Sequence, residues 1–586
     1  MEYIGLPEQD LNCEYNHKRY FTTDNKGNLI QFRDPSEDGY LSCCYCKFER
    51  KKRSELEIEI VTACKRIESN VTKVPVDYEF IVVKCLTSKN DDAYYKFVDI
   101  FGFVPLKPSA NKSNVKDPRT KKSVNVVVLG IDALSHMNFQ RQFESSYHYL
   151  VNNLSAFGML GYNKNDDNTY PNILPVLSGL SASELQKTSW YANQVFDDAP
   201  LIWKNFSQEG YRTAFTEDAI HVGLFLHEKR GFLDPPTDYY HLPLLRAMDT
   251  QIGHTSNGGV ANMCLGSRLS FEVLLDLMRK MATTMNKSKR YFHFIWSTAL
   301  THDQLNYGQF GDHLLLETLQ WFNTEGYLND TVLILMSDHG IRSGDILSTL
   351  QGKIEERMPF VYFMIPQWFQ ETYPYAIQNL QGNKQRLTTH FDLHETLMDL
   401  LHLNNIENYY LWKRQSQLAD SRKVPRGISL FLQIPLTRTC EDAGLSHHWC
   451  VCRKLKPVFL EGNEIVVEGA RQAVETLNTM LSNSLKCQKL VLDSVLNAQV
   501  YPITDDIFLD HSEILQVIED PRLETQPVTY NIAFKVQPSG GEFEATVTHQ
   551  TNGSWEVYKE ISRTNMYGRQ SHCIQDSILK KYCYCR

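Results

Sequence analysis

The spacing of hydrophobic residues differs between parts of this chain, and each kind of spacing predicts helices or strands. Between residues 124 and 435, short continuous apolar runs alternate with longer segments of helical character. A continuous apolar run indicates a strand that is buried on both faces. Strands that alternate with helices form a mostly parallel sheet with helices on both faces. We therefore expect an α/β domain over this range.

The positions of these elements follow from the same pattern. Apolar runs predict five strands, at residues 124–130, 213–215, 291–296, 332–336 and 360–365. Helices are predicted at residues 269–285, 314–323 and 392–403. The last helix has Thr389 or Asp392 near its start, either of which suits a helix N-terminus.

The segments on either side differ from this domain. Residues 1–105 contain short β-like runs, such as 80–84 and 95–99, and predict a Cys-rich N-terminal β domain. Residues 106–123 are rich in Pro, Ser, Asn, Lys and Asp, a composition typical of a linker.

The last part of the chain mixes a helical stretch with alternating β-like positions. The helical stretch is at 468–485, and the alternation is at 528–536 and 542–549. We expect a Cys-containing C-terminal α+β subdomain there. The predicted division is therefore 1–105, 106–123, 124–435 and 436–586.

Two of the predicted strands end in side chains suited to metal chemistry. The run at 332–336 leads to Asp338 and His339, and the run at 124–130 leads to Asp132. In open α/β sheets, ligands bind at this end of the strands. A carboxylate and an imidazole are costly to bury unpaired, and both are good zinc ligands. The alternative is that these residues are helix caps or turn residues.

A hydroxyl follows some forty residues after Asp132, in Asn168-Thr-Tyr-Pro-Asn172. A metal ion lowers the pKa of a hydroxyl, and the alkoxide then attacks phosphorus or sulfur. Thr169 is our candidate nucleophile, and Tyr170 is the neighbour with which it could be confused. Thr169 could also be an ordinary residue of an Asn-rich loop.

These motifs resemble the alkaline phosphatase superfamily, which includes nucleotide phosphodiesterases, sulfatases and phosphoethanolamine transferases. The similar segments are the metal-ligand strand Gly130-Ile-Asp132, the nucleophile turn Thr169-Tyr-Pro-Asn172 and the metal pair of Ser337-Asp-His-Gly340. Together with Pro425-Arg-Gly-Ile-Ser-Leu430 they are similar to the sulfatase-like DUF229 family, a domain of unknown function found in secreted and membrane-anchored animal proteins.

The resemblance implies a fold and a set of site residues. The fold is that of alkaline phosphatases and sulfatases, over about residues 124–435. The implied zinc ligands are Asp132, Thr169, Asp338 and His339. One zinc is expected, whereas a second is open because the two-zinc phosphodiesterases have Asp where this chain has Thr298, four residues before His302.

Other candidate residues keep more than one interpretation. His302 resembles a histidine beside the metal in phosphoethanolamine transferases, and Asp303 could serve as a substitute metal ligand. Asn172 could bind a phosphoryl oxygen or cap the following helix. His390 suits helix-start packing better than metal binding. Arg342 could pair with a substrate oxyanion or with Asp345.

The predicted function is phosphoryl transfer through a Thr nucleophile. The chain lacks the Cys-x-Pro-x-Arg motif, or its Ser equivalent, that makes formylglycine in type I sulfatases. We expect a metal-dependent hydrolase or transferase acting on phosphodiester or phosphoethanolamine-type groups of glycans or lipids. The alternatives are a degenerate lumenal binding protein and a sulfatase-like enzyme without formylglycine. Residues 180–260 are where we expect substrate specificity.

Charge narrows the range of partners. The formal net charge is −9 over 586 residues, and there is no long basic run. A nucleic acid is therefore not an expected partner. A small-molecule, glycan or lipid substrate is expected instead.

Cysteines and sequons indicate the secretory pathway. Thirteen of the fourteen cysteines lie outside the predicted α/β domain, and only Cys264 lies within it. This distribution favours disulfides, with Cys264 the candidate for a free thiol. Zinc at Cys450/Cys452 or Cys583/Cys585 is a weaker alternative. N-glycans are expected at seven sequons: Asn70, Asn111, Asn153, Asn205, Asn286, Asn329 and Asn552.

The start of the sequence does not resemble a signal peptide. The first residues have no basic or apolar signal region, and no apolar stretch is long enough to span a bilayer. Taken with the cysteines and sequons, we expect the lumenal or extracellular part of a protein whose signal or membrane anchor is missing from this sequence.

Overall fold

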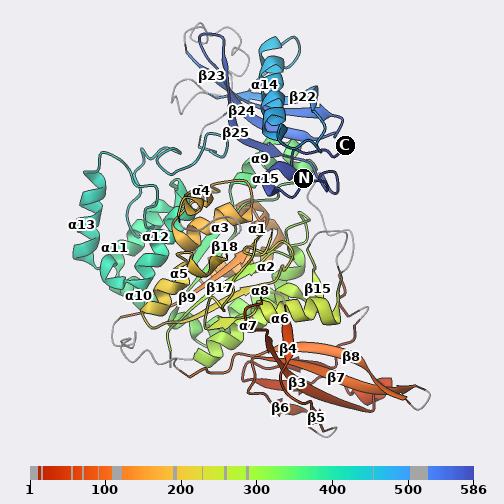
Figure 1. Cartoon of the computed structure of the whole chain (residues 1–586). Helices are drawn as coiled ribbons and strands as arrows, with labels where there is room; N and C mark the ends of the chain where they lie inside the picture. Colours follow the sequence, from red (N-terminus) through yellow and green to blue (C-terminus); the bar gives the residue numbers. More distant parts are fainter. Residues whose placement is uncertain are drawn as a thin grey trace. The chain divides into compact units, whose positions relative to one another are not determined.

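The computed structural model divides the chain into two compact units (Figure 1). The first comprises residues 1–164, 168–341 and 358–438, and the second comprises 165–167, 342–357 and 439–586. The structure describes residues 11–14, 17–54, 57–68, 71–89, 92–108, 122–188, 195–227, 229–255, 261–285, 289–452, 455–501 and 526–586. Most of the predicted linker, and the sequons at Asn70, Asn111 and Asn286, lie outside them.

The first unit is built on a seven-stranded sheet. Its strand order is β10 (Phe157–Gly158), β19 (Val361–Met364), β18 (Thr331–Met336), β9 (Asn125–Ile131), β17 (Tyr291–Ser297), β12 (Arg212–Glu217) and β13 (Tyr239–Tyr240). The five strands from β18 to β13 pair in parallel. The strand β19 pairs antiparallel with β18 and with β10. The mostly parallel α/β sheet predicted from the sequence is confirmed.

Alternate residues of these strands enter two hydrophobic cores, one on each face of the sheet. In β9, Val126 and Val128 enter one core, and Val127 and Leu129 enter the other. The first core is completed by α3 (Thr169–Ser178), α5 (Ile202–Gln208) and α12 (His390–Leu401). The second is completed by α2 (Glu144–Asn152), α7 (Ser270–Met285) and α8 (Gln309–Thr324). Helices therefore cover both faces, as predicted.

The predicted elements appear with shifted ends. All five predicted strands are present, and the three predicted helices correspond to α7, α8 and α12. The helix α12 starts two residues before the prediction, because Thr389 is its N-cap and forms a capping box with Asp392. The fifth predicted strand, β19, runs against its neighbour, which its apolar composition does not reveal.

Antiparallel strands precede the parallel sheet in the first unit. One sheet pairs β4 (Ile58–Ile60), β3 (Ser42–Arg50), β7 (Phe80–Lys89) and β8 (Asp92–Gly102), with β5 (Lys65–Ile67) on β3. A smaller sheet joins β1 (Phe21–Thr23), β2 (Asn28–Gln31) and β6 (Lys73–Pro75). Phe48, Phe80, Val82 and Ile100 place one face of the larger sheet in the same core as α3 and α12.

Disulfides link several of these segments. In the first unit they join Cys43 to Cys85, Cys46 to Cys64, and Cys13 to Cys264. The expectation that Cys264 is the free thiol is therefore wrong. The sequence could not show this pairing, because its two cysteines lie 251 residues apart.

The second unit contains an antiparallel sheet packed against a long helix. The strand order is β21 (Lys456–Pro457), β22 (Val491–Val500), β23 (Val528–Gln537), β24 (Glu542–His549) and β25 (Trp555–Arg563). The helix α14 (Glu464–Leu481) covers it with Val466, Val474 and Leu477 (Figure 1). The C-terminal α+β region predicted from the sequence is confirmed, and its helix begins and ends four residues earlier than the predicted 468–485.

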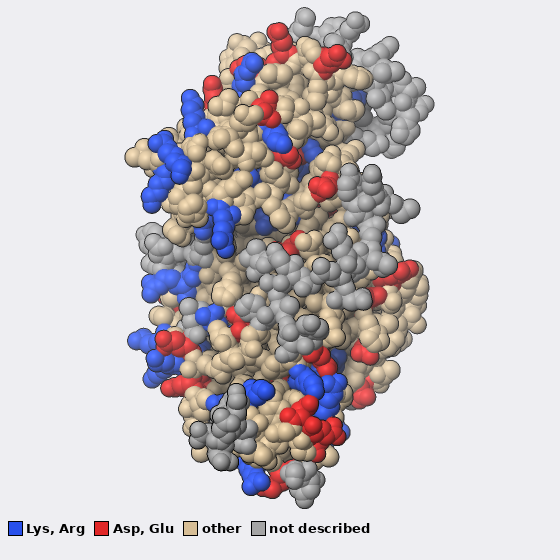
Figure 2. All heavy atoms as spheres, turned by 90° about the vertical axis from the view of Figure 1, so that its right-hand side faces the viewer, with Lys and Arg blue, Asp and Glu red and all other residues tan. Residues whose placement is uncertain are grey.

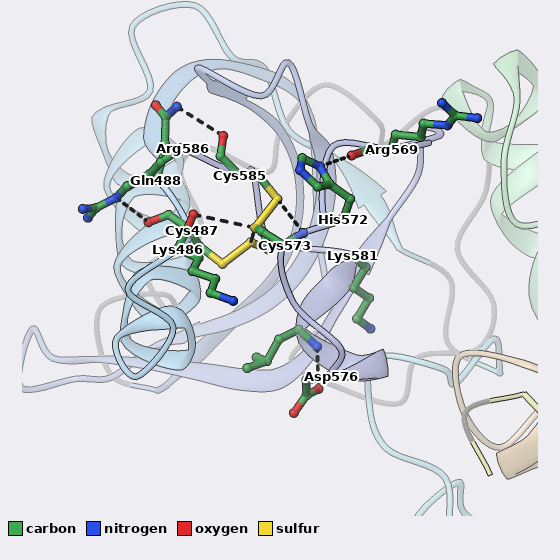
Figure 3. Close-up of a disulfide and its surroundings, with 12 residues drawn as sticks. Lys486, Cys487, Gln488, Arg569, His572, Cys573, Asp576, Lys581, Cys585 and Arg586 are labelled. Atoms are coloured by element: carbon green, nitrogen blue, oxygen red, sulfur yellow. Dashed lines mark hydrogen bonds between the residues drawn. A yellow bond between two sulfur atoms is a disulfide. The ribbon is translucent and has the colours of Figure 1, made fainter. Parts of the chain in front are cut away.

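The last residues of the chain are tied into this unit by cysteines (Figure 3). Disulfides join Cys487 to Cys583 and Cys573 to Cys585. The backbone N–H of Arg586 also donates to the Lys486 carbonyl oxygen at 3.0 Å. A third disulfide joins Cys440 to Cys450.

A buried charged cluster holds the segment 342–357 in the second unit. Its helix α9 (Leu350–Arg357) brings Lys353 and Arg357 to Glu544 of β24. The Lys353 Nζ lies 2.8 Å from a Glu544 carboxylate oxygen, and Asn531 donates to the same carboxylate at 2.9 Å. The Glu544 charge is thus fully paired although the side chain is buried.

The surface carries both signs of charge. Lys and Arg side chains are interspersed with Asp and Glu side chains on the face shown in Figure 2. Among the described residues, no helix is both long and apolar enough to cross a membrane.

Candidate metal centre

The two acid-bearing strand ends meet at one edge of the parallel sheet. Strands β9 and β18 are adjacent and parallel, with Met336 opposite Gly130. Continuing this register by two residues places Asp338 opposite Asp132. Both side chains are buried, as is His339. The structure thus brings together the three residues that the sequence singled out on strand ends.

The candidate nucleophile joins them from a helix. Thr169 is the first residue of α3, and the extended backbone of Asn168 precedes it. The Thr169 Oγ1 lies 3.3 and 3.4 Å from the two carboxylate oxygens of Asp132, and 3.4 Å from His339 Nε2. It also hydrogen-bonds the Asp338 carboxylate. The hydroxyl therefore contacts all three strand-end residues.

The backbone sets which nitrogen of His339 faces this cluster. Its Nδ1 lies 2.8 Å from the Gly340 carbonyl oxygen. A carbonyl only accepts hydrogen bonds, so Nδ1 carries the proton and Nε2 presents its lone pair. That Nε2 lies 3.1 Å from Asp338 Oδ2 and 3.9 Å from Asp132 Oδ1. An imidazole in this state is ready to bind a metal ion.

The charge at Asp338 is stabilised only in part by the protein. Burial raises the pKa of Asp338, against hydrogen bonds from the Ala133 N–H, the Thr169 hydroxyl and the His339 N–H. Within the described part of the chain, no Lys or Arg forms an ion pair with Asp338. Its buried Oδ2 also has no hydrogen-bond donor there. A buried carboxyl in this setting is stabilised either by a bound cation or by protonation.

The spacing of the four side chains fits one tetrahedral zinc. Four ligand atoms at about 2.0–2.2 Å from a tetrahedral zinc lie about 3.3–3.6 Å from one another. The separations given above, from 3.1 to 3.9 Å, bracket this range. Two carboxylates, one imidazole and one hydroxyl are also a donor set that zinc accepts. Asp132, Asp338 and His339 thus form a candidate metal site.

His302 lies on a turn that is joined to this edge. Thr301 donates from its Oγ1 to the Asp132 carbonyl oxygen at 2.5 Å. The next residue, His302, pairs through Nδ1 with Asp303 Oδ1 at 2.9 Å. Among the described residues, His302 makes no hydrogen bond to Asp132, Thr169, Asp338 or His339. Its side chain is partly exposed.

The remaining predicted residues have contacts of their own. Asn172 is buried inside α3 and donates to the Asn168 carbonyl oxygen at 3.0 Å. Its alternative as a helix cap is wrong, because Asn168 is the N-cap. The Arg342 Nη1 lies 3.9 Å from Asp167 Oδ1, in the second unit.

His390 has the packing role that was favoured. It starts α12, packs against Tyr162 in a tilted arrangement with ring centroids 4.8 Å apart, and hydrogen-bonds the backbone of Ser337. Burial lowers the pKa of His390 to about 3.

Sequence reasoning missed Asp218, which belongs to the same edge. It follows β12 and accepts hydrogen bonds from the Thr298 N–H at 2.7 Å and the Ser297 hydroxyl at 2.9 Å. Asp218 thus orders the turn that leads to His302. The signal was present, because Asp218 ends an apolar strand as Asp132 does.

The cysteine alternative for zinc is not supported. Cys450, Cys583 and Cys585 are all in disulfides and offer no thiolate.

Fold and site together define an α/β protein with a candidate metal centre at the carboxyl edge of a parallel sheet. The model of the DUF229 family, described as a protein of unknown function, matches residues 7–496, and the chain belongs to this family. No curated protein matches the chain.

Solved structures give distant similarities. The periplasmic domain of EptC from Escherichia coli, in complex with zinc, has 11% identity and a TM-score of 0.35, covering 49% of this chain and 85% of that one. The lipoteichoic acid synthase LtaP from Listeria monocytogenes has 11% identity and a TM-score of 0.34, covering 48% and 72%. A protein of the alkaline phosphatase superfamily from Vibrio parahaemolyticus has 10% identity and a TM-score of 0.34, covering 79% and 85%. Similarities at this level carry no conclusion about function.

Proposed function

We propose that the protein is a zinc-dependent phosphoryl-transfer enzyme with Thr169 as its nucleophile. One observation carries the proposal: the Thr169 hydroxyl converges on Asp132, Asp338 and His339 at distances that suit a shared zinc. Zinc, when bound, would lower the pKa of this hydroxyl and offset negative charge on the transferring group.

The reaction proceeds in two displacements. The Thr169 oxygen attacks phosphorus, the bond from phosphorus to the leaving oxygen breaks, and a phosphothreonine ester forms. Water or an acceptor alcohol then attacks the same phosphorus and releases Thr169. The N-terminus of α3 lies beside the new ester, because Thr169 is its first residue and the Asn168 side chain makes no capping hydrogen bond.

His302 is the proposed proton carrier for the leaving oxygen. Its Nδ1 is 2.9 Å from the Asp303 carboxylate, which fixes the orientation of the ring. The Nε2 can then give a proton to the departing alkoxide and take one from the incoming alcohol or water. Asn172, whose amide is bound to the Asn168 carbonyl oxygen, is assigned to holding the start of α3.

The proposed substrates are phosphodiester or phosphoethanolamine-type groups on glycans or lipids. This follows from the resemblance of the Thr-Tyr-Pro-Asn turn and from the absence of a formylglycine motif. We place the enzyme in the secretory pathway, because six disulfides are stable in an oxidising compartment. The sequons at Asn153, Asn329 and Asn552 are on exposed residues and are proposed glycosylation sites.

The test combines metal analysis with a substrate screen. Purified protein is analysed for zinc and then assayed on phosphodiester, phosphoethanolamine and sulfate ester substrates. We expect about one zinc per chain and turnover of a phosphorus ester that the Thr169→Ala variant lacks. Protein without zinc and without turnover would support a degenerate binding protein instead. Turnover of sulfate esters alone would support the sulfatase-like alternative.

A further inference from the structure

Three cysteine sulfurs lie together near the start of the second unit. Cys440 and Cys450 form a disulfide, and Cys452 follows two residues later in the sequence. The sulfur atoms of the three residues all lie within 4.8 Å of one another. Cys452 takes part in none of the six disulfides and keeps its thiol. A thiol this close to a disulfide has the partners needed for thiol–disulfide exchange.

The three sulfurs differ in their access to solvent. Cys452 is exposed, whereas Cys450 is buried at 6% exposure. The nucleophile in exchange is a thiolate, and reactive cysteines are found at partly exposed positions. Cys452 is therefore the sulfur that is placed to attack, and the disulfide beside it is the group that it can reach.

The loop that carries these cysteines is held in place by other contacts. His448 lies 3.1 Å from the Thr546 hydroxyl through Nδ1 and 2.7 Å from the Ser562 hydroxyl through Nε2. The neighbouring Trp449 is buried at 2% exposure. These contacts do not require the Cys440–Cys450 bond. The loop can therefore keep the three sulfurs close while that bond changes partner.

The two possible pairings of Cys440 close loops of similar size. Cys440 and Cys450 are 10 residues apart, and Cys452 lies two residues further on. The probability of closing a loop falls as about the 3/2 power of its length, so the two pairings differ by a factor of only about 1.3. Chain entropy therefore allows both pairings.

We propose that Cys440, Cys450 and Cys452 form an exchange site in which Cys450 and Cys452 alternate as the disulfide partner of Cys440. The Cys452 thiolate attacks the Cys440 sulfur, the Cys440–Cys450 bond breaks, and Cys450 leaves and takes up the proton that Cys452 has lost. One disulfide and one thiol are present before and after, so no oxidant or reductant is consumed.

The exchange determines which side chain carries the thiol. In one pairing the thiol is on the exposed Cys452, and in the other it is on the buried Cys450. The site thereby switches a reactive thiol on this surface on and off. This inference does not depend on the proposed phosphoryl transfer.

Two-step thiol labelling of the full chain tests the proposal. The protein is kept at about pH 8, where exchange is fast, and is then denatured in mild acid, where thiolate is scarce. A first maleimide labels the thiols, and a second is added after reduction. Trypsin releases residues 439–453 as one peptide with all three cysteines, so fragmentation shows which cysteine carries the first label.

We expect the first label to be shared between Cys452 and Cys450. In Cys450→Ser, Cys440 should pair with Cys452, so that the first label is lost from this peptide. Cys450→Ser/Cys452→Ser is the matched control and should carry the first label on Cys440. Cys44→Ser removes the other thiol of the chain, in the first unit, and should leave the label distribution unchanged.

Two results would overturn the proposal. One is a first label on Cys452 alone in the wild-type protein, which would mean that Cys440 and Cys450 do not exchange partners. The other is a folded Cys450→Ser protein that carries the first label on Cys440. The wild-type measurement decides the question even where a variant does not fold.

Discussion

Two buried acids in different units of the molecule have pKa values that are shifted in opposite directions. Asp338 ends the strand β18 of the first unit, and Glu544 lies in β24 of the second. Burial raises the pKa of Asp338. Burial also acts to raise the pKa of Glu544, but Lys353, Arg357 and His448 outweigh it and hold that pKa well below its ordinary value.

The two acids differ in the cationic side chains that pair with them. Glu544 has two cationic side chains within the second unit, so its charge is balanced and its role is to hold α9. Asp338 has an imidazole that presents a lone pair, and the opposing carboxylate of Asp132. The Glu544 cluster is balanced by cations of the protein, whereas Asp338 has no Lys or Arg ion-pair partner in the described part of the chain. Buried charge that the protein leaves unbalanced is the better indicator of chemistry.

The largest expected effect comes from removing two metal ligands. Asp338→Ala/His339→Ala should reduce bound zinc from about one per chain to almost none and abolish turnover, because only Asp132 and Thr169 remain. Elemental analysis and activity assays measure this. His313→Ala, at an exposed histidine, is the control and should keep its zinc. Unchanged zinc in the double variant would refute the site.

Removing the nucleophile separates chemistry from metal binding. Thr169→Ala should lower kcat by about 10³-fold or more while zinc is retained, because the three strand-end ligands remain. Thr169→Ser should keep part of the activity, since the hydroxyl survives without the methyl that restricts its rotamer. Mass mapping after an acid quench should find phosphate on Thr169. An adduct on Tyr170, or full activity of Thr169→Ala, would reject the assignment.

The effect of His302 should depend on the leaving group. His302→Ala should lower kcat by about 10²-fold on an alkyl phosphodiester, because the departing alkoxide then lacks its proton donor. The loss should nearly vanish with a p-nitrophenyl ester, whose leaving group needs no proton. Steady-state kinetics on the two esters measure the ratio. An equal loss on both esters would assign His302 to structure or binding.

The charged cluster around Glu544 should contribute to folding stability but not to metal binding. Glu544→Ala leaves Lys353 and Arg357 buried without their anion, which should cost about 3–5 kcal/mol of unfolding free energy. Urea unfolding measures this cost, and zinc content should stay normal. Glu542→Ala, on the same strand but paired with Lys535 at a more exposed position, should cost less than about 1 kcal/mol. A similar cost for both would mean that burial of the cluster is unimportant.

The smallest effect is a pH dependence of the same cluster. A folded-state pKa held below the unfolded value gives stability that is present above the unfolded pKa and is lost as pH falls through the folded pKa. The advantage of wild type over Glu544→Gln should therefore be constant near neutral pH and begin to shrink as pH falls below about 4.5, the ordinary pKa of a Glu carboxyl. Unfolding midpoints across pH 3–7 test the sign, and an advantage that grows with acid would contradict it.

Sequence alone predicted the parallel sheet and the clustered site. Continuous apolar runs at 124–130 and 332–336 marked strands, and Asp132, Asp338 and His339 marked their carboxyl ends. The hydrophobic period and the residues at strand ends are local properties of the sequence. They can therefore be recognised without knowing which segments pair in the fold. The predicted metal ligands remain proposals, but their proximity could be anticipated from the parallel arrangement.

Other features depend on pairing between distant residues. The direction of β19, the Cys13–Cys264 disulfide and the place of residues 342–357 in the second unit all rest on long-range contacts. The local composition of these segments is compatible with pairing to several other parts of the chain. The four-part domain division also remains a prediction. Residues 165–167 and 342–357 belong to the second unit, although residues of the first unit flank them in the sequence.

The Cys13–Cys264 disulfide constrains the order of events during biosynthesis. Its partners are 251 residues apart, whereas Cys46 and Cys64 are only 18 apart. At about 5–20 residues per second, the ribosome needs roughly 10–50 seconds between the two cysteines. During that interval Cys13 must wait as a thiol or in a temporary pairing. The short disulfides can close as the chain emerges, but the N-terminal segment can be locked only after α/β strands as far as β13 have been made.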